Sequence, residues 1–569
     1  MNRTRLGALT TILIWLSLAA ACASIAPANP PAQASSGVDR TESSAPRVLT
    51  MAIPRELDAW NTDLVRVSRG GGISTLSSLA HNKLTVEDDR FSWIPELAVE
   101  QLSVEKGTWR INPDSTMETI WRIHPNVRWH DGEPFTSEDL LFTFRVMKDP
   151  EVPNTIGAAL RIMESATAPD PYTLVIRWSR LYVEADQAPW LTAMPRHLLE
   201  EAYARDKASF PSHPWMTTEF VGLGPYRLAR WERGSHMEFT RFDQYFKGRP
   251  PLDAVVVRFT PDENVMLAAL LAGQLDVIPA TTFDIDAALE VKRRWEGTGN
   301  QVGGDLTGRL ITLEPQHRVE FARPAQGLAT LLVRRAMYQA IDRDQLAEVI
   351  TRGFTSAADS WFFPTHELRA QLEPSIPRLP YSLSAAQQQF SQAGWAQGPQ
   401  GNLLHTQTGE QFAVQIAMPR IYEREASIIA DSWRATGAVV EESVISSERL
   451  ADLEGLAKLP GARMATQSHA NLYTDRFHST SIAGPENRWT GRNWSGYSNP
   501  RLDAALDGLV TTIAPAARLP LHRELLQEQL GNLVIMPLYW EYNPFFVVRG
   551  VTGIRNGGAW NIFEWNKAS

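Results

Sequence analysis

The sequence predicts an α/β fold that is built around more than one hydrophobic core. Segments with the alternating pattern of strands and segments with the 3.6-residue pattern of helices follow one another along the chain, without a repeat of fixed period. The chain has 569 residues, which is more than one simple core normally organises. Hydrophobic residues make up 43% and charged residues 21%, so large apolar areas can be buried.

The first half of the chain contains several clear elements. Alternating or β-branched runs predict strands at residues 47–53, 118–123, 227–231 and 252–259. Residues 136–139 have the pattern of a capping box, and the helix that follows places Leu140, Phe144 and Met147 on one face.

A second unit of this half covers residues 221–280. Residues 222–226 form a glycine-rich turn in which Gly222 and Gly224 permit a tight backbone path. Residues 260–263 predict another capping box, with Pro261 at the first helical position. Gly273 is expected to stop this helix before a strand at 275–278.

The second half is again mixed. Strands are expected at 413–417, 438–441 and 535–539. Helices are expected at 333–340 and 521–530. A third helix is expected to begin after the capping residue Asp342, and a fourth to contain Ile428 and Trp433. A fifth is expected to begin after Asn499 and to turn three leucines inward.

The N-terminus has the pattern of an export signal. Arg3 and Arg5 precede an apolar run at 6–21, which is shorter than the ~20 residues that span a bilayer. Small residues lead to Cys22, as in a bacterial lipobox, so residues 1–21 are predicted to be a signal peptide and Cys22 a lipidation site. The alternatives are an ordinary secretory signal with a chance cysteine, or an uncleaved anchor. Residues 22–46, rich in Ala, Pro and Ser, then form a flexible tether.

Composition and motifs exclude several functional classes. The single cysteine excludes an intramolecular disulfide and a cysteine-built metal site, and the net charge of −9 gives no footprint for nucleic acid. There is no phosphate-binding loop, no H-E-x-x-H pair and no G-x-S-x-G elbow. His124 and His130 are better explained as turn or surface residues than as metal ligands. The sequence thus predicts no enzyme activity, no cofactor and no metal.

Six collinear segments resemble the extracytoplasmic solute-binding proteins of ABC importers, family 5, the peptide- and nickel-binding type. The run at 129–136, Trp-His-Asp-Gly-Glu-Pro-Phe-Thr, is similar to that family's signature. The other similar segments are 222–226 (Gly-Leu-Gly-Pro-Tyr), 245–250, 261–278, 333–343, and 496–500 together with 536–539. The resemblance covers about residues 47–556.

The resemblance implies a two-lobed binding-protein fold of type II, large peptide-binding class, with a hinge between the lobes. Lobe 1 would be 47–283, including a subdomain at about 85–215; lobe 2 would be 284–536; and residues 537–569 would return to lobe 1. It further implies a monomeric receptor that captures a peptide or another small polar solute. The receptor would deliver it to an ABC permease and its ATPase subunits, anchored by lipid at the outer face of the bacterial cytoplasmic membrane.

Specificity is less clearly indicated. Peptide-binding relatives carry an acidic residue in a W-x-A-D-Y-x-D-P stretch, but the corresponding region, 467–476, lacks that pattern and has Asp475 as its only acid. His469 and His478 support a nickel site no better. Because aromatic faces concentrate in binding clefts, the chain's 19 tryptophans offer another route. The candidate ligand contacts are Trp60, Trp361, Tyr473, Asp475, Trp494, Trp540 and Glu541.

Two other functions remain open. The same fold could serve as a sensor or scaffold lipoprotein that is not dedicated to transport, and sequence alone does not separate this from import. An exported hydrolase is the third alternative, and it would require a nucleophile and a base placed together in the cleft.

Overall fold

The computed structural model describes residues 45–61, 64, 72–152, 158–187, 192–281, 283–325, 327–446, 448–468, 475–555 and 558–568. Residues Pro46–Ser569 form one compact unit. Within the described ranges, none of the helices combines the length and the apolar character that crossing a bilayer requires.

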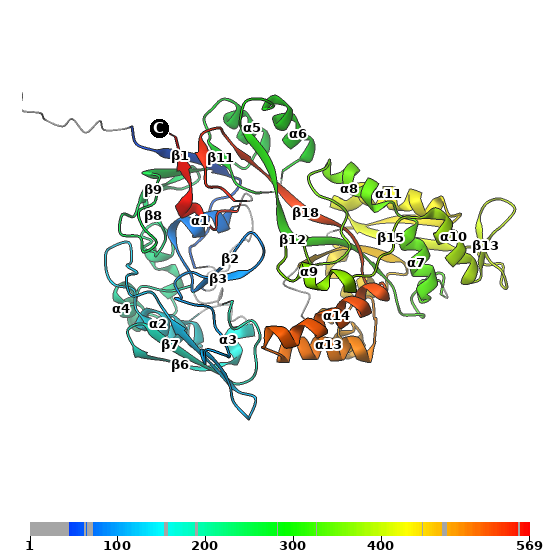
Figure 1. Ribbon diagram of the computed structural model, residues 1–569, viewed down its shortest axis with the longest axis horizontal. Coiled ribbons are helices and arrows are strands. Elements are labelled where there is room, and N and C mark those ends of the chain that lie inside the picture. The colour runs from blue at the N-terminus through cyan, green and yellow to red at the C-terminus, as the bar shows by residue number, and fades with distance from the viewer. Residues whose placement is uncertain are drawn as a thin grey trace, which may run out of the picture. The chain divides into compact units, whose positions relative to one another are not determined.

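A mixed ten-stranded sheet, counted over the described residues, runs through this unit (Figure 1). Its strands, in spatial order, are β16 (Val439–Ile445), β15 (Ala413–Pro419), β17 (Ala462–Ser468), β12 (Gln301–Pro315), β18 (Met536–Val547), β11 (Val277–Ile278), β1 (Val48–Ile53), β10 (Ala254–Phe259), β9 (His236–Arg241) and β8 (Tyr226–Glu232). The predicted α/β class is confirmed by this sheet and the helices around it.

Two long antiparallel strands, β12 and β18, join the two ends of the sheet (Figure 1). Their register begins with Gln301 opposite Val547 and ends with Leu313 opposite Met536. At one end β12 also pairs with β17, and at the other end β18 pairs with β11. The ladder is interrupted between Leu306 and Leu310, where a bulge bends the strand.

Smaller sheets complete the strand content. A four-stranded sheet contains β4 (Trp109–Ile111), β5 (Met117–Arg122), β7 (Thr173–Trp178) and β6 (Met163–Asp170). The two-stranded sheets pair β2 (Thr85–Glu87) with β3 (Trp93–Pro95), β13 (Trp395–Gln397) with β14 (Leu403–His405), and β19 (Val551–Thr552) with β20 (Asn566–Lys567).

The helices cover the sheets on both sides of the long strands (Figure 1). They are α1 (Ile73–Ala80), α2 (Ser137–Lys148), α3 (Ala158–Ile162), α4 (Arg196–Arg205), α5 (Glu263–Leu271), α6 (Ile285–Arg294), α7 (Leu331–Gln339), α8 (Arg343–Thr351), α9 (Arg369–Leu372), α10 (Leu383–Gln392), α11 (Glu423–Arg434), α12 (Leu453–Ala457), α13 (Pro500–Thr511) and α14 (Pro515–Gly531).

The buried hydrophobic side chains form separate cores. The largest contains Leu49, Trp121 and Phe239 together with Trp565 from the C-terminal segment. Others are built around Ile311 and Trp433, around Trp361 and Leu506, and around Leu270 and Phe546. Several cores in one chain agree with the predicted two-lobed fold. The boundaries at 47–283, 284–536 and 537–569, and the subdomain at about 85–215, stay predictions.

Local capping signals were reliable guides to several helices. The Thr136–Asp139 capping box is formed at the start of α2, and Leu140, Phe144 and Met147 are buried on that helix as expected. Asp342 accepts a hydrogen bond from the backbone N–H of Gln345, which confirms it as the cap of α8. Asn499 caps α13 in the same way.

Three expected boundaries were wrong. The predicted capping box at 260–263 does not start α5; Asp262 caps it instead, accepting hydrogen bonds from Asn264 and Val265, so the helix begins two residues later. Helix α14 begins at Pro515, six residues before the expected start, and carries Pro520 inside. Strand β18 continues eight residues past the expected end at Tyr539.

The glycine-rich turn before β8 is required by close packing against α1. A Cβ at Gly222 would lie 2.0 Å from the carbonyl oxygen of Ala80, and one at Gly224 would lie 2.4 Å from the carbonyl oxygen of Leu79. His130 holds the same turn, because its ring nitrogens contact the N–H of Gly222 and the carbonyl of Gly224. The turn is therefore fixed by contact with neighbouring backbone.

We expect Gly222→Ala to lower the free energy of unfolding by about 3 kcal/mol, since the backbone of α1 must move to accept the new methyl group. The matched control is Gly531→Ala, because a Cβ at that helical position meets nothing within 4 Å. The control should be neutral or slightly stabilising. Urea unfolding measures both, and equal midpoints for the two variants would contradict this account.

Candidate ligand-binding site

A cavity of about 780 Å³ lies between α1, the β2–β3 hairpin, the β12 bulge and the C-terminal segment. Its wall includes Ser77, His81, Asn82, Lys83, Glu87, Asp88, Asp89, Phe91, Trp93, Glu96, Tyr245, Asp305, Thr307, Arg309, Glu541, Asn543, Arg555, Trp560 and Phe563. These residues come from segments that lie far apart in the sequence. The cavity is therefore created by the tertiary fold.

The β12 bulge positions one polar pair in this wall. Thr307 donates a hydrogen bond of 2.9 Å to the carboxylate of Glu541, and Arg309 forms an ion pair of 3.1 Å with the same carboxylate. Glu541 lies on β18, directly across the interruption in the ladder. The bulge thus turns side chains of two paired strands toward the cavity.

The β2–β3 hairpin supplies three acids of the wall, Glu87, Asp88 and Asp89. Its turn, 88–92, is tied by Asp88, whose carboxylate accepts hydrogen bonds from the N–H groups of Arg90 and Ser92. Phe91 has a φ of 59°, a left-handed conformation that is uncommon for an aromatic residue. Its ring stacks on Phe363 with 4.2 Å between centroids. This contact fixes the hairpin tip beside the core that contains Phe363.

Carboxylates outnumber cations in the described wall of the cavity. Six acids line it: Glu87, Asp88, Asp89, Glu96, Asp305 and Glu541. The lining cations are Lys83, Arg309 and Arg555. The wall therefore carries an excess of negative groups in a space that is partly shielded from bulk water.

Two of these acids have displaced pKa values. Burial, followed by the nearby Asp89 carboxylate, raises the pKa of Asp305 to about 7. The pKa of Glu87 also rises to about 7, from burial first and Asp88 second. The two environments differ, because Glu87 is exposed and Asp305 is half-buried. Screening by solvent therefore reduces the upward shift in pKa more at Glu87 than at Asp305.

His81 and Asn82 form the inner wall. Burial lowers the pKa of His81 to about 3, with Lys83 and His130 contributing, so the imidazole is neutral at physiological pH. Asn82 is 3% exposed and donates from its side-chain nitrogen to the hydroxyl of Tyr245. Its Oδ1 atom accepts no hydrogen bond from the described residues.

A second cavity, of about 670 Å³, adjoins the first. The two share Asp89, Asp305 and Leu306, and the second continues along α8 past Asp344 and Glu348. Its described wall contains these four carboxylates and no lysine, arginine or histidine. We call these two adjoining cavities, which meet at Asp305, the acid-lined channel.

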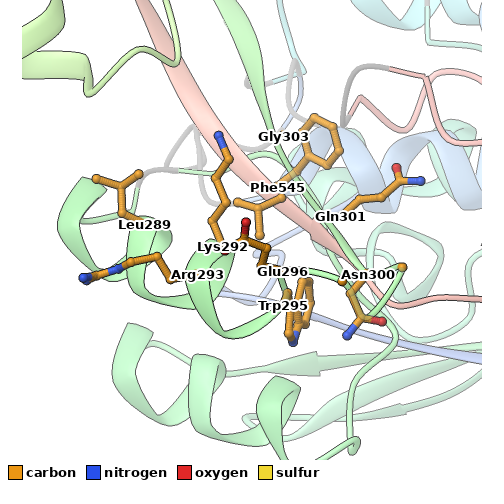
Figure 2. Close-up of a pocket in the computed structure, with 12 residues that line it drawn as sticks. Leu289, Lys292, Arg293, Trp295, Glu296, Asn300, Gln301, Gly303 and Phe545 are labelled. Atoms are coloured by element: carbon orange, nitrogen blue, oxygen red, sulfur yellow. The ribbon is translucent and has the colours of Figure 1, made fainter.

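A third pocket, of about 750 Å³, lies where α6 meets the start of β12. Figure 2 shows Lys292, Arg293 and Trp295 along the end of the helix, with Phe545 against Gly303. Apart from Phe545, its wall comes from the single stretch 289–303, and it shares no described residue with the first cavity. We therefore take the first cavity as the candidate ligand site.

The structure places three predicted tryptophans in hydrophobic cores. Trp60 stacks on Phe220 at 4.4 Å and donates its indole N–H to the carbonyl of Thr217. Trp361 is 1% exposed, and Trp540 is 2% exposed. These three residues lie outside the described wall of the cavity. Their role as ligand contacts stays a prediction.

The other predicted residues are spread more widely. Trp494 is half-buried beneath the guanidinium of Arg463, 4.0 Å from the ring centroid, and lies outside the cavity wall as described. Glu541 does line the cavity. Tyr473 and Cys22 lie outside the described residues, and Asp475 is described only as the first residue of a short helical turn at Asp475–Phe477.

Sequence reasoning missed the acids of the β2–β3 hairpin and of β12. The usable signal was the run Glu87-Asp88-Asp89, three consecutive acids in a short hairpin. Asp305 follows two glycines in a long strand and gave no signal by itself. The tryptophans that do line the cavity are Trp93 and Trp560.

The described part of the chain holds no group of three or more His, Cys, Asp or Glu side chains arranged to bind a metal ion.

Comparison with known sequences gives the family. Residues 102–476 match the bacterial extracellular solute-binding proteins, family 5. The chain is 21% identical over 400 residues to the oligopeptide-binding protein AppA of Bacillus subtilis, covering 67% of this chain and 68% of that one. It is 26% identical over 437 residues to protein XP55 of Streptomyces lividans, covering 72% and 71%. The chain belongs to this family of solute-binding proteins.

Solved structures show the same fold. HbpA2 from Haemophilus parasuis superposes with a TM-score of 0.73 at 16% identity, covering 92% of this chain and 100% of that chain. AppA from Bacillus subtilis, in complex with a nonapeptide, gives 0.60 at 18% identity, covering 92% and 100%. NikZ from Campylobacter jejuni, in complex with Ni(L-His), gives 0.63 at 18% identity, covering 91% and 99%. The predicted two-lobed binding-protein fold is confirmed.

Coverage is lower for another group of relatives. The chain spans about half the length of a candidate ABC transporter peptide-binding protein of Brucella ovis, with 26% identity over 295 residues, 51% of each chain. Family membership therefore rests on the family match and on the longer alignments.

The raised pKa of Asp305 predicts a pH-dependent stability. Because its folded pKa of about 7 exceeds the ordinary value near 4, its favourable contribution is complete below pH ~4 and is lost as the pH rises through ~7. Asp305→Asn should therefore flatten the fall in unfolding free energy across this window, on the order of 1 kcal/mol. Thermal midpoints from pH 4 to 8 measure it.

The matched control is Glu164→Gln, an exposed acid on β6 outside both cavities. It should leave the difference between pH 4 and pH 8 unchanged. If Asp305→Asn and the unmodified chain show parallel pH profiles, Asp305 ionises normally and this interpretation fails.

Proposed function

We propose that this protein is the extracytoplasmic receptor of an ABC importer, and that it captures a peptide or another small polar solute in the cavity beside the β12 bulge. The captured ligand is delivered to a membrane permease whose ATPase subunits drive transport. The observation that carries the proposal is the cavity itself. It collects polar and aromatic side chains from both ends of the chain, within a fold that belongs to a solute-binding family.

The relatives support binding rather than catalysis. AppA of Bacillus subtilis is named for oligopeptides, and a protein of Escherichia coli with 22% identity over 275 residues is named for dipeptides. The cavity has the mixture of Trp93, Trp560, Asn82 and carboxylates that suits a flexible polar ligand. Binding across the long strands would stabilise the arrangement in which the walls meet.

The N-terminal pattern supports attachment to a membrane. The apolar run at 6–21 and the small residues before Cys22 suit export and lipidation, and residues 22–46 suit a tether of roughly 25–30 Å. The receptor would then act at the outer face of the cytoplasmic membrane, within reach of its permease.

Binding should raise the thermal stability of the purified protein. A solute at one hundred times its Kd stabilises the folded chain by about 2.7 kcal/mol. We expect members of a library of short peptides and polar solutes to raise the melting temperature, and Trp560→Ala to weaken that response. Trp433→Ala is the comparison, since that side chain lies in a core outside the cavity. Its loss should lower stability without lowering affinity. Absence of any stabilising solute would contradict the receptor proposal.

Export and lipidation can be tested separately. In a bacterial host, Cys22→Ala should abolish incorporation of a labelled fatty acid and release the chain from the membrane fraction. Ser24→Ala, two residues away in the tether, is the control and should leave both unchanged. Continued labelling of Cys22→Ala would show that this cysteine is not the attachment point.

A further inference from the structure

Resting on the proposed function, we infer that the site selects a ligand with more than one positive charge, seated along the acid-lined channel on either side of Asp305. Ligands of this chemistry are peptides rich in lysine or arginine and polyamines.

Two carboxylates in the channel are left without protein cations. Neither Glu87 nor Asp305 takes part in an ion pair or a side-chain hydrogen bond among the described residues. Asp89 lies close enough to Asp305 to disfavour its ionisation, and Asp88 has the same effect on Glu87. A negative charge on Glu87 or on Asp305 is therefore unfavourable until a cation enters.

The cations of the wall are already engaged. Arg309 is paired with Glu541 at 3.1 Å, and Arg555 is paired with Glu564 at 3.0 Å. Lys83 has an interaction of its own and adds to the positive field at Glu96, which is itself paired with Lys247 at 2.9 Å. These cations therefore do not neutralise Glu87 and Asp305.

An independent observation on the inner wall points to a donor ligand. Asn82 is only 3% exposed, and it lines the same cavity. Its nitrogen is used by Tyr245, while its Oδ1 has no donor among the described residues. A buried acceptor without a donor is costly. This atom exposes less than 1 Å², so the Asn82 side chain must turn toward the cavity before an ammonium or guanidinium group can supply the missing N–H. The neighbouring His81 is neutral and adds no opposing charge.

The second cavity explains why more than one charge is favoured. It continues from Asp305 and Asp89 to Asp344 and Glu348, and no basic side chain lines its described wall. A ligand that places one cation near Glu87 can extend a second past Asp305 toward Asp344. Hydrophobic spacers of such a ligand meet Leu306 and Phe354 along the way.

Isothermal titration with end-blocked peptides tests this inference. Pentapeptides that carry two lysines are compared with partners in which both lysines are glutamine, and spermidine forms a separate arm. We expect the lysine peptides or spermidine to bind at least tenfold more tightly than the glutamine peptides. Asp305→Asn should reduce that preference about tenfold, because it removes one carboxylate from the channel. A tenfold change corresponds to ~1.4 kcal/mol. Glu164→Gln should leave it unchanged.

The affinity for the cationic ligand should also rise from pH 6 to pH 8, as Asp305 and Glu87 ionise. Glu87→Gln provides a second variant in case Asp305→Asn is poorly folded. A preference for spermidine over lysine peptides would identify the amine rather than the peptide as the source of the charge.

Three outcomes separate the two proposals. Equal affinity for lysine and glutamine peptides overturns the charge selection and leaves the receptor function standing. Tight binding of Ca²⁺ or Mg²⁺ alone at Asp305 overturns it as well, because the acids would then serve a metal. Binding of no solute at all, cationic or neutral, counts against the receptor function itself.

Discussion

The pairing of β12 with β18 is the constraint on which the rest of the structure depends. One strand pair contributes Ile311 and Leu538 to one core, and Phe546 and Val547 to two others. A shift of one residue in a strand reverses which side chains face the core, so burial at both ends locks the register. The bulge between Leu306 and Leu310 interrupts this ladder in the middle. Because the register is fixed at both ends, the position of the bulge is fixed as well, and it lies at the cavity wall.

The sequence was most informative where a structure depends on neighbouring residues. The cap of α8 at Asp342 and the buried face of α2 involve contacts within one helical turn, and both could be predicted. The extension of β18 could not. The expected strand ended at Tyr539, yet residues 542–544 pair with β12 at residues more than 230 positions away. Long-range pairing overrides local propensity in such a strand.

The candidate site shows the same division. Tryptophans were natural candidates, but a Trp side chain offers so much apolar area that Trp60, Trp361 and Trp540 pack into cores. Asp305 gains its unusual environment first from burial and then from Asp89, which the hairpin brings to it from another part of the chain. Nothing local to Asp305 encodes that encounter. Glu541 was predicted as a polar candidate, and the bulge turns it into the cavity.

The hairpin tip connects these features. Phe91 is held in a left-handed conformation, which costs on the order of 1 kcal/mol, and its ring stacks on Phe363. Phe363 in turn packs against Trp540 at 4.1 Å, so the stack ends on β18. The apolar stack therefore holds Asp89 near Asp305 against the repulsion between the two carboxylates. If the ligand is the cation inferred above, a positive group between these acids would remove the repulsion and leave the stack unopposed. Ligand charge and closure of the walls would then be coupled through the same few residues, since each would favour the arrangement that the other requires.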